Sequence, residues 1–138
     1  MKIMKKDIRQ YTKQIKLIIA SNITYLKKRL NIFPKATIKK LNRMKLEKEI
    51  EFQGKKYTSN QLTKEVLSKY RDLHKEINPF SYTDVLRPFI QECKQNEDNM
   101  NEVYEKYRNI LTERLKKDKD DLYFCLDALK IIEKSFKE

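Results

Sequence analysis

Residues 26–44 read LKKRLNIFPKATIKKLNRM, and the rest of the expected architecture follows from this stretch. Apolar residues recur at helical spacing on both sides of a short joint, Asn31 to Pro34. Asn tolerates the left-handed backbone of a tight turn, and Pro suits the first turn of a helix because its missing N–H would have no partner there. The stretch therefore predicts two helices, over 23–30 and 36–44, joined by a tight turn.

This arrangement resembles the helix-turn-helix superfamily of DNA-binding proteins over about twenty residues. The resemblance implies that the second helix lies in the major groove of double-stranded DNA, where its outward side chains reach bases and phosphates. The outward residues are Lys35, Thr37, Lys39, Lys40, Asn42 and Arg43. The sequence departs from the pattern at Phe33, where a capping Ser or Thr is usual. The alternative is two ordinary helices joined by a Pro-containing turn.

After Met44 the apolar spacing changes from helical to alternating. Residues 49–58, EIEFQGKKYT, carry apolar side chains between polar ones on both sides of Gly54, the only glycine. This pattern predicts a short β-hairpin, and a hairpin after such a helix is the order of elements in a winged helix. Lys55 and Lys56 at the hairpin tip are further candidates for contact with DNA.

Residues 5–20 are expected to form another amphipathic helix, with basic side chains outside an isoleucine-rich stripe. Ser21 or Asn22 would cap the next helix, although nothing forbids one helix over 5–30. The prediction is an N-terminal winged helix-turn-helix of three helices and a short hairpin. The same basic segment would also suit a membrane surface. However, its stripe has no Trp or Phe and other helices are available to cover it, so we expect no membrane contact.

The positive charge of the chain lies in one half. Residues 1–58 hold 17 Lys and Arg against 4 Asp and Glu, a net charge of +13, whereas residues 59–138 hold 15 against 16, a net charge of −1. Such asymmetry indicates a polyanion partner for the first half. We therefore expect a basic winged helix-turn-helix domain over 1–58 and a near-neutral helical region for dimerisation or interaction over 59–138.

The second half is expected to be helical throughout. Thr58 and Gln61 have the spacing of a capping box, Asn78-Pro79 ends the helix that follows, and Pro88 lies inside the next helix or just before its regular part. From Met100 a heptad spacing continues to the end of the chain, which favours one long helix over two helices hinged at 117–121. Its apolar stripe is expected to form a homodimer interface through Leu111, Leu115, Leu122, Leu129, Ile132 and Phe136.

Catalysis has little support in the sequence. There is no Cys/His metal cluster, no Gly-rich phosphate loop and no Ser or Cys paired with a His, so we expect a protein that is not an enzyme and binds no metal or cofactor. A tyrosine nucleophile for DNA strand transfer, among Tyr11, Tyr25 and Tyr57, would need an Arg/His cluster. Cys93 and Cys125 are expected to be buried thiols in a cytoplasmic protein.

The sequence thus predicts a DNA-binding protein, sequence-specific or structure-specific, that acts as a dimer. A small transcriptional regulator or an accessory protein of a plasmid or phage would fit. The first alternative is a helical module that binds a partner protein, for which four tyrosines would suit an interface: Tyr70, Tyr82, Tyr104 and Tyr107. The second alternative is RNA binding through the same basic half.

Overall fold

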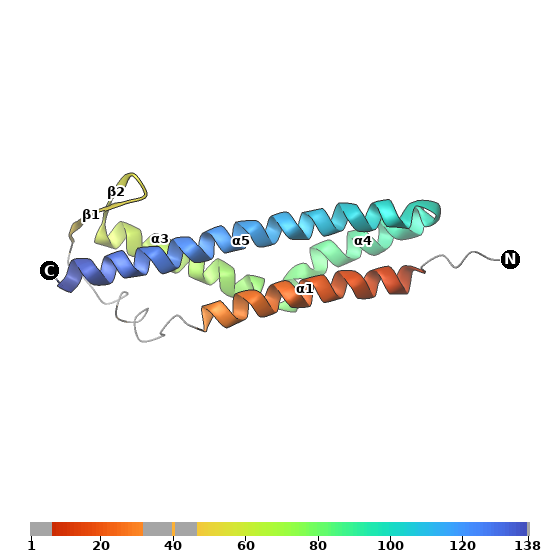
Figure 1. The fold of residues 1–138 in the computed structure, drawn as a ribbon, viewed down its shortest axis with the longest axis horizontal. Coiled ribbons are helices and arrows are strands. Elements are labelled where there is room, and N and C mark those ends of the chain that lie inside the picture. The colour runs from red at the N-terminus through yellow and green to blue at the C-terminus, as the bar shows by residue number, and fades with distance from the viewer. Residues whose placement is uncertain (1–6, 32–39, 41–46, 138) are drawn as a thin grey trace.

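The computed structural model describes residues 7–31, 40 and 47–137. Its helices form an elongated bundle of three rods with a small hairpin at one end (Figure 1). One rod is α1, the second is α3 followed end to end by α4, and the third is α5, which runs the length of the bundle. The elements are α1 (Ile8–Leu30), β1 (Glu49–Phe52), β2 (Lys55–Thr58), α3 (Ser59–Glu76), α4 (Thr83–Gln95) and α5 (Met100–Lys137). The prediction of a mainly helical chain with one short hairpin is confirmed.

Helix α1 is continuous, so the predicted break at Ser21 or Asn22 is wrong and the competing prediction of a single helix is right. Asp7 caps its first turn, where the carboxylate accepts hydrogen bonds from the N–H groups of Arg9 at 2.7 Å and Gln10 at 3.3 Å. Asn22 lies on the buried face of the helix and is 8% exposed, so it is not at a helix end.

The predicted three-helix arrangement of the N-terminal winged helix-turn-helix is therefore wrong for its first two helices. Two of its three predicted helices, over 5–20 and 23–30, are one helix. The third, over 36–44, lies outside the described residues apart from Lys40, which is helical and exposed.

The hairpin forms as predicted. Gln53 and Gly54 connect its strands with positive φ angles of 52° and 76°, as a two-residue turn requires, and Phe52 pairs with Lys55 beside that turn. Ile50 and Phe52 point into the bundle, and the ring of Phe52 meets that of Phe124 in α5 edge-on at 5.1 Å. The hairpin is therefore fixed to the end of the bundle by its apolar face.

The second rod bends between α3 and α4. The capping box is confirmed: the Thr58 side chain accepts from the N–H of Gln61 at 3.2 Å, and the Gln61 side chain accepts from the N–H of Thr58 at 3.1 Å. Pro79 opens a short 3-10 helix, η1 (Pro79–Tyr82), because the residue before a proline avoids helical geometry. Helix α4 then runs through Pro88 without ending.

Helix α5 is one helix of 38 residues, which confirms the prediction of a single long helix over the hinged alternative. At 1.5 Å per residue it is about 57 Å long. It packs against α1, against α3 over its second half and against α4 over its first half.

The apolar side chains form two cores, one toward each end of the bundle. The hairpin-end core combines the last turns of α1 with β1, α3 and the second half of α5. The other core combines the first half of α1 with η1, α4 and the first half of α5. Both cores contain side chains from both predicted domains, 1–58 and 59–138, so the packing does not follow the division of charge.

A polar layer separates the two cores. Arg114 of α5 binds Glu76 of α3 and also donates to the carbonyl of Ser81 at 3.1 Å. Asp118, one turn further along α5, is 6% exposed, and its burial, with the hydrogen bond to Glu76 and the charge of that residue, raises its pKa to about 7. Through Glu76 this layer joins α5 to α3, so we assign the carboxyl pair a structural role.

The stripe that was expected to form a dimer interface is covered within one chain. Leu111, Leu122 and Ile132 are fully buried, Leu129 is 6% exposed and Leu115 is half-buried. The side chain of Phe136 lies outside the described part. Helices α1, α3 and α4 together cover these described side chains, so the stripe does not need a second chain to bury it.

Candidate nucleic-acid interface

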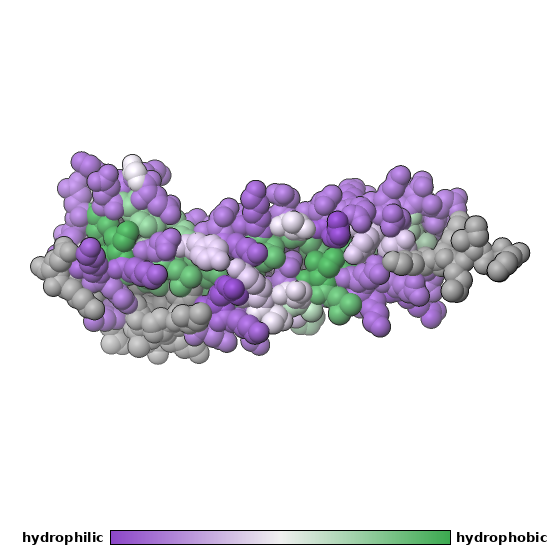
Figure 2. Space-filling view, viewed as in Figure 1, coloured by the Kyte–Doolittle hydropathy of each residue, from purple (hydrophilic) through white to green (hydrophobic). Residues whose placement is uncertain are grey.

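Helix α1 carries six basic residues and no acidic residue between Ile8 and Leu30. The six are Arg9, Lys13, Lys16, Lys27, Lys28 and Arg29, of which all but the half-buried Arg29 are exposed. On the face seen in Figure 2, hydrophilic side chains cover most of the surface. A helix of 23 residues that offers only positive charge to solvent attracts polyanions.

A groove of about 400 Å³ lies between α1 and α4. Arg9, Lys13 and Lys16 line it from one side of α1, because residues three and four positions apart are neighbours on a helix. Lys94 lines it from α4. The remaining lining is Ile8, Thr12 and Ile90. The groove therefore brings four cations together over a partly apolar floor, with no carboxylate in its lining.

The four groove cations form no ion pair with any residue that the structure describes. Other lysines of the bundle are paired: Lys69 lies 3.2 Å from Asp121, and Lys106 lies 2.8 Å from Glu92. Cations that share a groove without a carboxylate repel one another, and an anion placed between them relieves that repulsion. The groove is thus suited to phosphate groups.

A second cluster lies where the last turns of α1 meet α5. The hydroxyls of Tyr25 and Tyr123 are 3.1 Å apart and share a hydrogen bond. Two cations lie against the ring of Tyr25: the guanidinium carbon of Arg29 is 3.5 Å from the ring centre, and Nζ of Lys119 is 4.5 Å from it. Arg29 also donates to the Tyr25 carbonyl at 3.3 Å, which fixes its position.

The positive charges at this cluster lower the pKa of one tyrosine of the pair. The hydrogen bond from Tyr25 lowers the pKa of Tyr123, and the charges of Arg29 and Lys119 lower it further. The pKa of Tyr25 is raised, first by the same hydrogen bond and then by burial. The Tyr123 hydroxyl therefore lies in the field of two cations.

Most of the residues predicted to contact DNA lie outside the described residues: Lys35, Thr37, Lys39, Asn42 and Arg43. Lys40 is described as helical and exposed. Lys55 and Lys56 are exposed next to the hairpin turn, as expected, and Lys56 lies 4.0 Å from Glu49 in a weak surface pair.

The sequence reasoning missed the groove and the tyrosine cluster. The sequence predicted the basic side chains of α1, but the residues near Lys94 and Lys119 in the sequence do not show which helix packs beside each of these lysines. The tyrosines offered for a protein interface fit that role poorly: Tyr82 and Tyr107 are buried, while Tyr70 and Tyr104 are half-buried. The most exposed large apolar side chain described is instead Phe80, at 83%.

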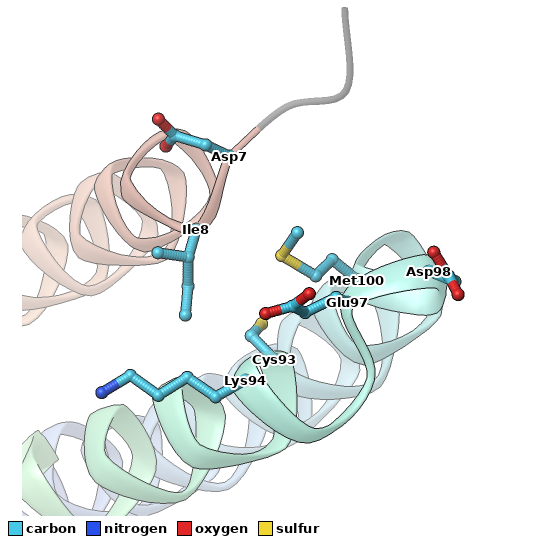
Figure 3. A pocket seen from close by; sticks show the side chains of 7 residues that line it. All are labelled: Asp7, Ile8, Cys93, Lys94, Glu97, Asp98 and Met100. Carbon is cyan, nitrogen blue, oxygen red and sulfur yellow. The ribbon is translucent and has the colours of Figure 1, made fainter. Parts of the chain in front are cut away.

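Another cavity, of about 390 Å³, lies at the end of the bundle away from the hairpin (Figure 3). Ile8 of α1 and Met100 of α5 extend toward its centre, and Asp98 points away from it. Its full lining is Asp7, Ile8, Cys93, Lys94, Glu97, Asp98 and Met100. Three carboxylates against one amine make it unfavourable for phosphate, so we exclude it from the interface.

Comparison with protein-family models, with curated proteins and with solved structures found no match for this chain. Within residues 7–31, 40 and 47–137, no helix combines the length and the apolar character needed to cross a bilayer. The same residues contain no group of three or more His, Cys, Asp or Glu side chains placed to hold a metal ion.

Proposed function

We propose that this protein binds DNA, and that the exposed face of α1 with the groove beside α4 is its main phosphate-binding surface. The observation that carries the proposal is the groove itself. Arg9, Lys13, Lys16 and Lys94 converge there, and none of them forms an ion pair with a described residue. Phosphate contacts supply most of the sequence-independent affinity for nucleic acid, and lysine and arginine make them.

The hairpin adds two lysines at the other end of the bundle, where Glu49 and Glu51 balance their charge. Lys55 and Lys56 stand beside its turn, and residues 26–44, which carry the helix-turn-helix resemblance, connect α1 to the hairpin along the chain. In this proposal α1 and the hairpin contact the backbone of the DNA. Base contacts, where they occur, come from Thr37, Lys39, Asn42 and Arg43. A small regulatory or accessory protein of DNA would use such a surface.

The salt dependence of binding tests this function. If about five phosphates are neutralised, the slope of the logarithm of the binding constant against the logarithm of salt concentration is about −4.5. Fluorescence anisotropy with a labelled duplex measures the slope, and a structured RNA of equal charge serves as the competitor. Binding that does not respond to salt would contradict the proposal, and preference for the RNA would favour the RNA-binding alternative.

A further inference from the structure

We propose that the cluster of Tyr25, Arg29, Lys119 and Tyr123 binds one nucleotide of a single-stranded or locally opened segment of DNA. The phosphate lies at the two cations and the unpaired base lies against the ring of Tyr123. This inference rests on the proposed function and specifies the form of the nucleic acid that the protein binds.

The phosphate part of the site follows from the two cations. Arg29 and Lys119 both lie against the ring of Tyr25, and neither forms an ion pair with a described residue. The contact with the ring, and for Arg29 the hydrogen bond to the Tyr25 carbonyl, hold their side chains in place before a ligand arrives.

The base part follows from the exposure of Tyr123. Its side chain is among the few large apolar ones left open to solvent in the described part, at 47%, although the hydrogen bond to Tyr25 restrains it. An exposed aromatic ring beside cations is the arrangement on which bases of single strands stack, because every base has a π-face. Bases within a duplex are already paired and stacked, so this contact selects unpaired ones.

A continuous surface connects this cluster with the groove. The two lie on opposite sides of α1, and the exposed face between them carries Leu17, Ala20, Ser21 and Thr24, with no carboxylate. Lys27 and Lys28 are exposed in the last turns of the same helix. A strand that crosses α1 therefore meets cations on both sides and no negative charge on the helix between them.

The experiment compares three labelled oligomers of one length: a thymidine single strand, an abasic single strand with the same phosphates, and a duplex. Anisotropy titrations use the full chain and the variants Tyr123→Leu, Tyr123→Phe and Phe80→Leu, with helical content checked by circular dichroism. Phe80→Leu is the matched control, because it removes an exposed aromatic ring from η1, far from the cluster in the sequence.

We expect Tyr123→Leu to weaken binding of the thymidine strand by about fivefold or more, and to leave the abasic strand and the duplex unchanged. Tyr123→Phe keeps the ring and should retain most of the affinity, and Phe80→Leu should change nothing. Arg29→Gln with Lys119→Gln should weaken the thymidine and abasic strands alike. Equal effects of Tyr123→Leu on all three oligomers, or no effect, would overturn the inference while leaving the proposed function intact. If no oligomer binds the wild type in a salt-dependent way, both fail.

Discussion

The guanidinium of Arg114 binds both carboxylate oxygens of Glu76, with Nε 2.6 Å from Oε2 and Nη2 2.8 Å from Oε1. The same guanidinium lies 3.9 Å from the centre of the Tyr82 ring. Arg114 therefore joins α5 to both sides of the bend in the second rod. Since this polar layer lies between the two apolar cores, the Arg114–Glu76 pair connects the two ends of the bundle.

Removal of Arg114 should destabilise the protein strongly. Arg114→Leu leaves Glu76 charged and mostly buried, which we expect to cost about 3 kcal/mol in the free energy of unfolding, measured by urea denaturation. The matched control is Arg108→Leu, whose pair with Glu105 is exposed and should contribute about 1 kcal/mol or less. Equal losses in the two variants would contradict the role given to Arg114.

Stability should fall as pH rises through about 7, because the Glu76–Asp118 pair then loses its shared proton. Burial raises the pKa of Glu76, but the hydrogen bonds from Arg114 and Asp118 lower it overall, so the proton resides on Asp118. Above the ordinary pKa of an Asp and below about 7, the folded state binds more protons than the unfolded state, and stability therefore decreases with rising pH.

Asp118→Asn tests this pH dependence. The amide keeps a hydrogen-bond donor toward Glu76 and cannot ionise, so the decline in the free energy of unfolding across this pH range should disappear. Urea denaturation at several pH values, from just above the ordinary pKa of an Asp to just above neutrality, measures it. A decline of the same slope in the variant would assign the pH dependence to other groups.

Leu122 should stabilise the single chain rather than a dimer. It is fully buried in the hairpin-end core, and Leu122→Ala should lower the free energy of unfolding by about 2–5 kcal/mol. The loss should be independent of protein concentration, because both partners of the contact belong to one chain. If instead the loss in free energy of unfolding grew on dilution, and light scattering showed a dimer for the wild type, the predicted dimer interface would be supported.

Local sequence signals predicted the elements that local chemistry determines. The capping box of Thr58, the turn at Gly54 and the heptad spacing from Met100 could each be predicted, because the residues that define them are close together in the chain. The break predicted at Asn22 failed because a good capping residue also tolerates burial in a helix. The residues that pack against Asn22 in the tertiary structure decide whether it caps a helix or is buried in one, and no local sequence pattern contains them.

Less of the candidate interface than of the fold could be predicted from the sequence. The sequence showed that the first half is basic, but the groove needs Lys94 and the tyrosine cluster needs Lys119 and Tyr123, all from the near-neutral half. These residues meet α1 only because α4 and α5 pack beside it. A net charge summed over a stretch of sequence cannot show which few cations share a surface.

The most direct test of DNA binding through α1 is the salt slope of a variant that has lost two groove cations. Lys13→Gln with Lys16→Gln removes charge from the groove, and Lys64→Gln with Arg71→Gln removes equal charge from exposed positions on α3. With labelled DNA, the groove variant should reduce the magnitude of the log–log salt slope by about 1.8, and the α3 variant should leave it unchanged. Equal reductions in the two variants, or none in the groove variant, would contradict the proposal that α1 is the phosphate-binding surface.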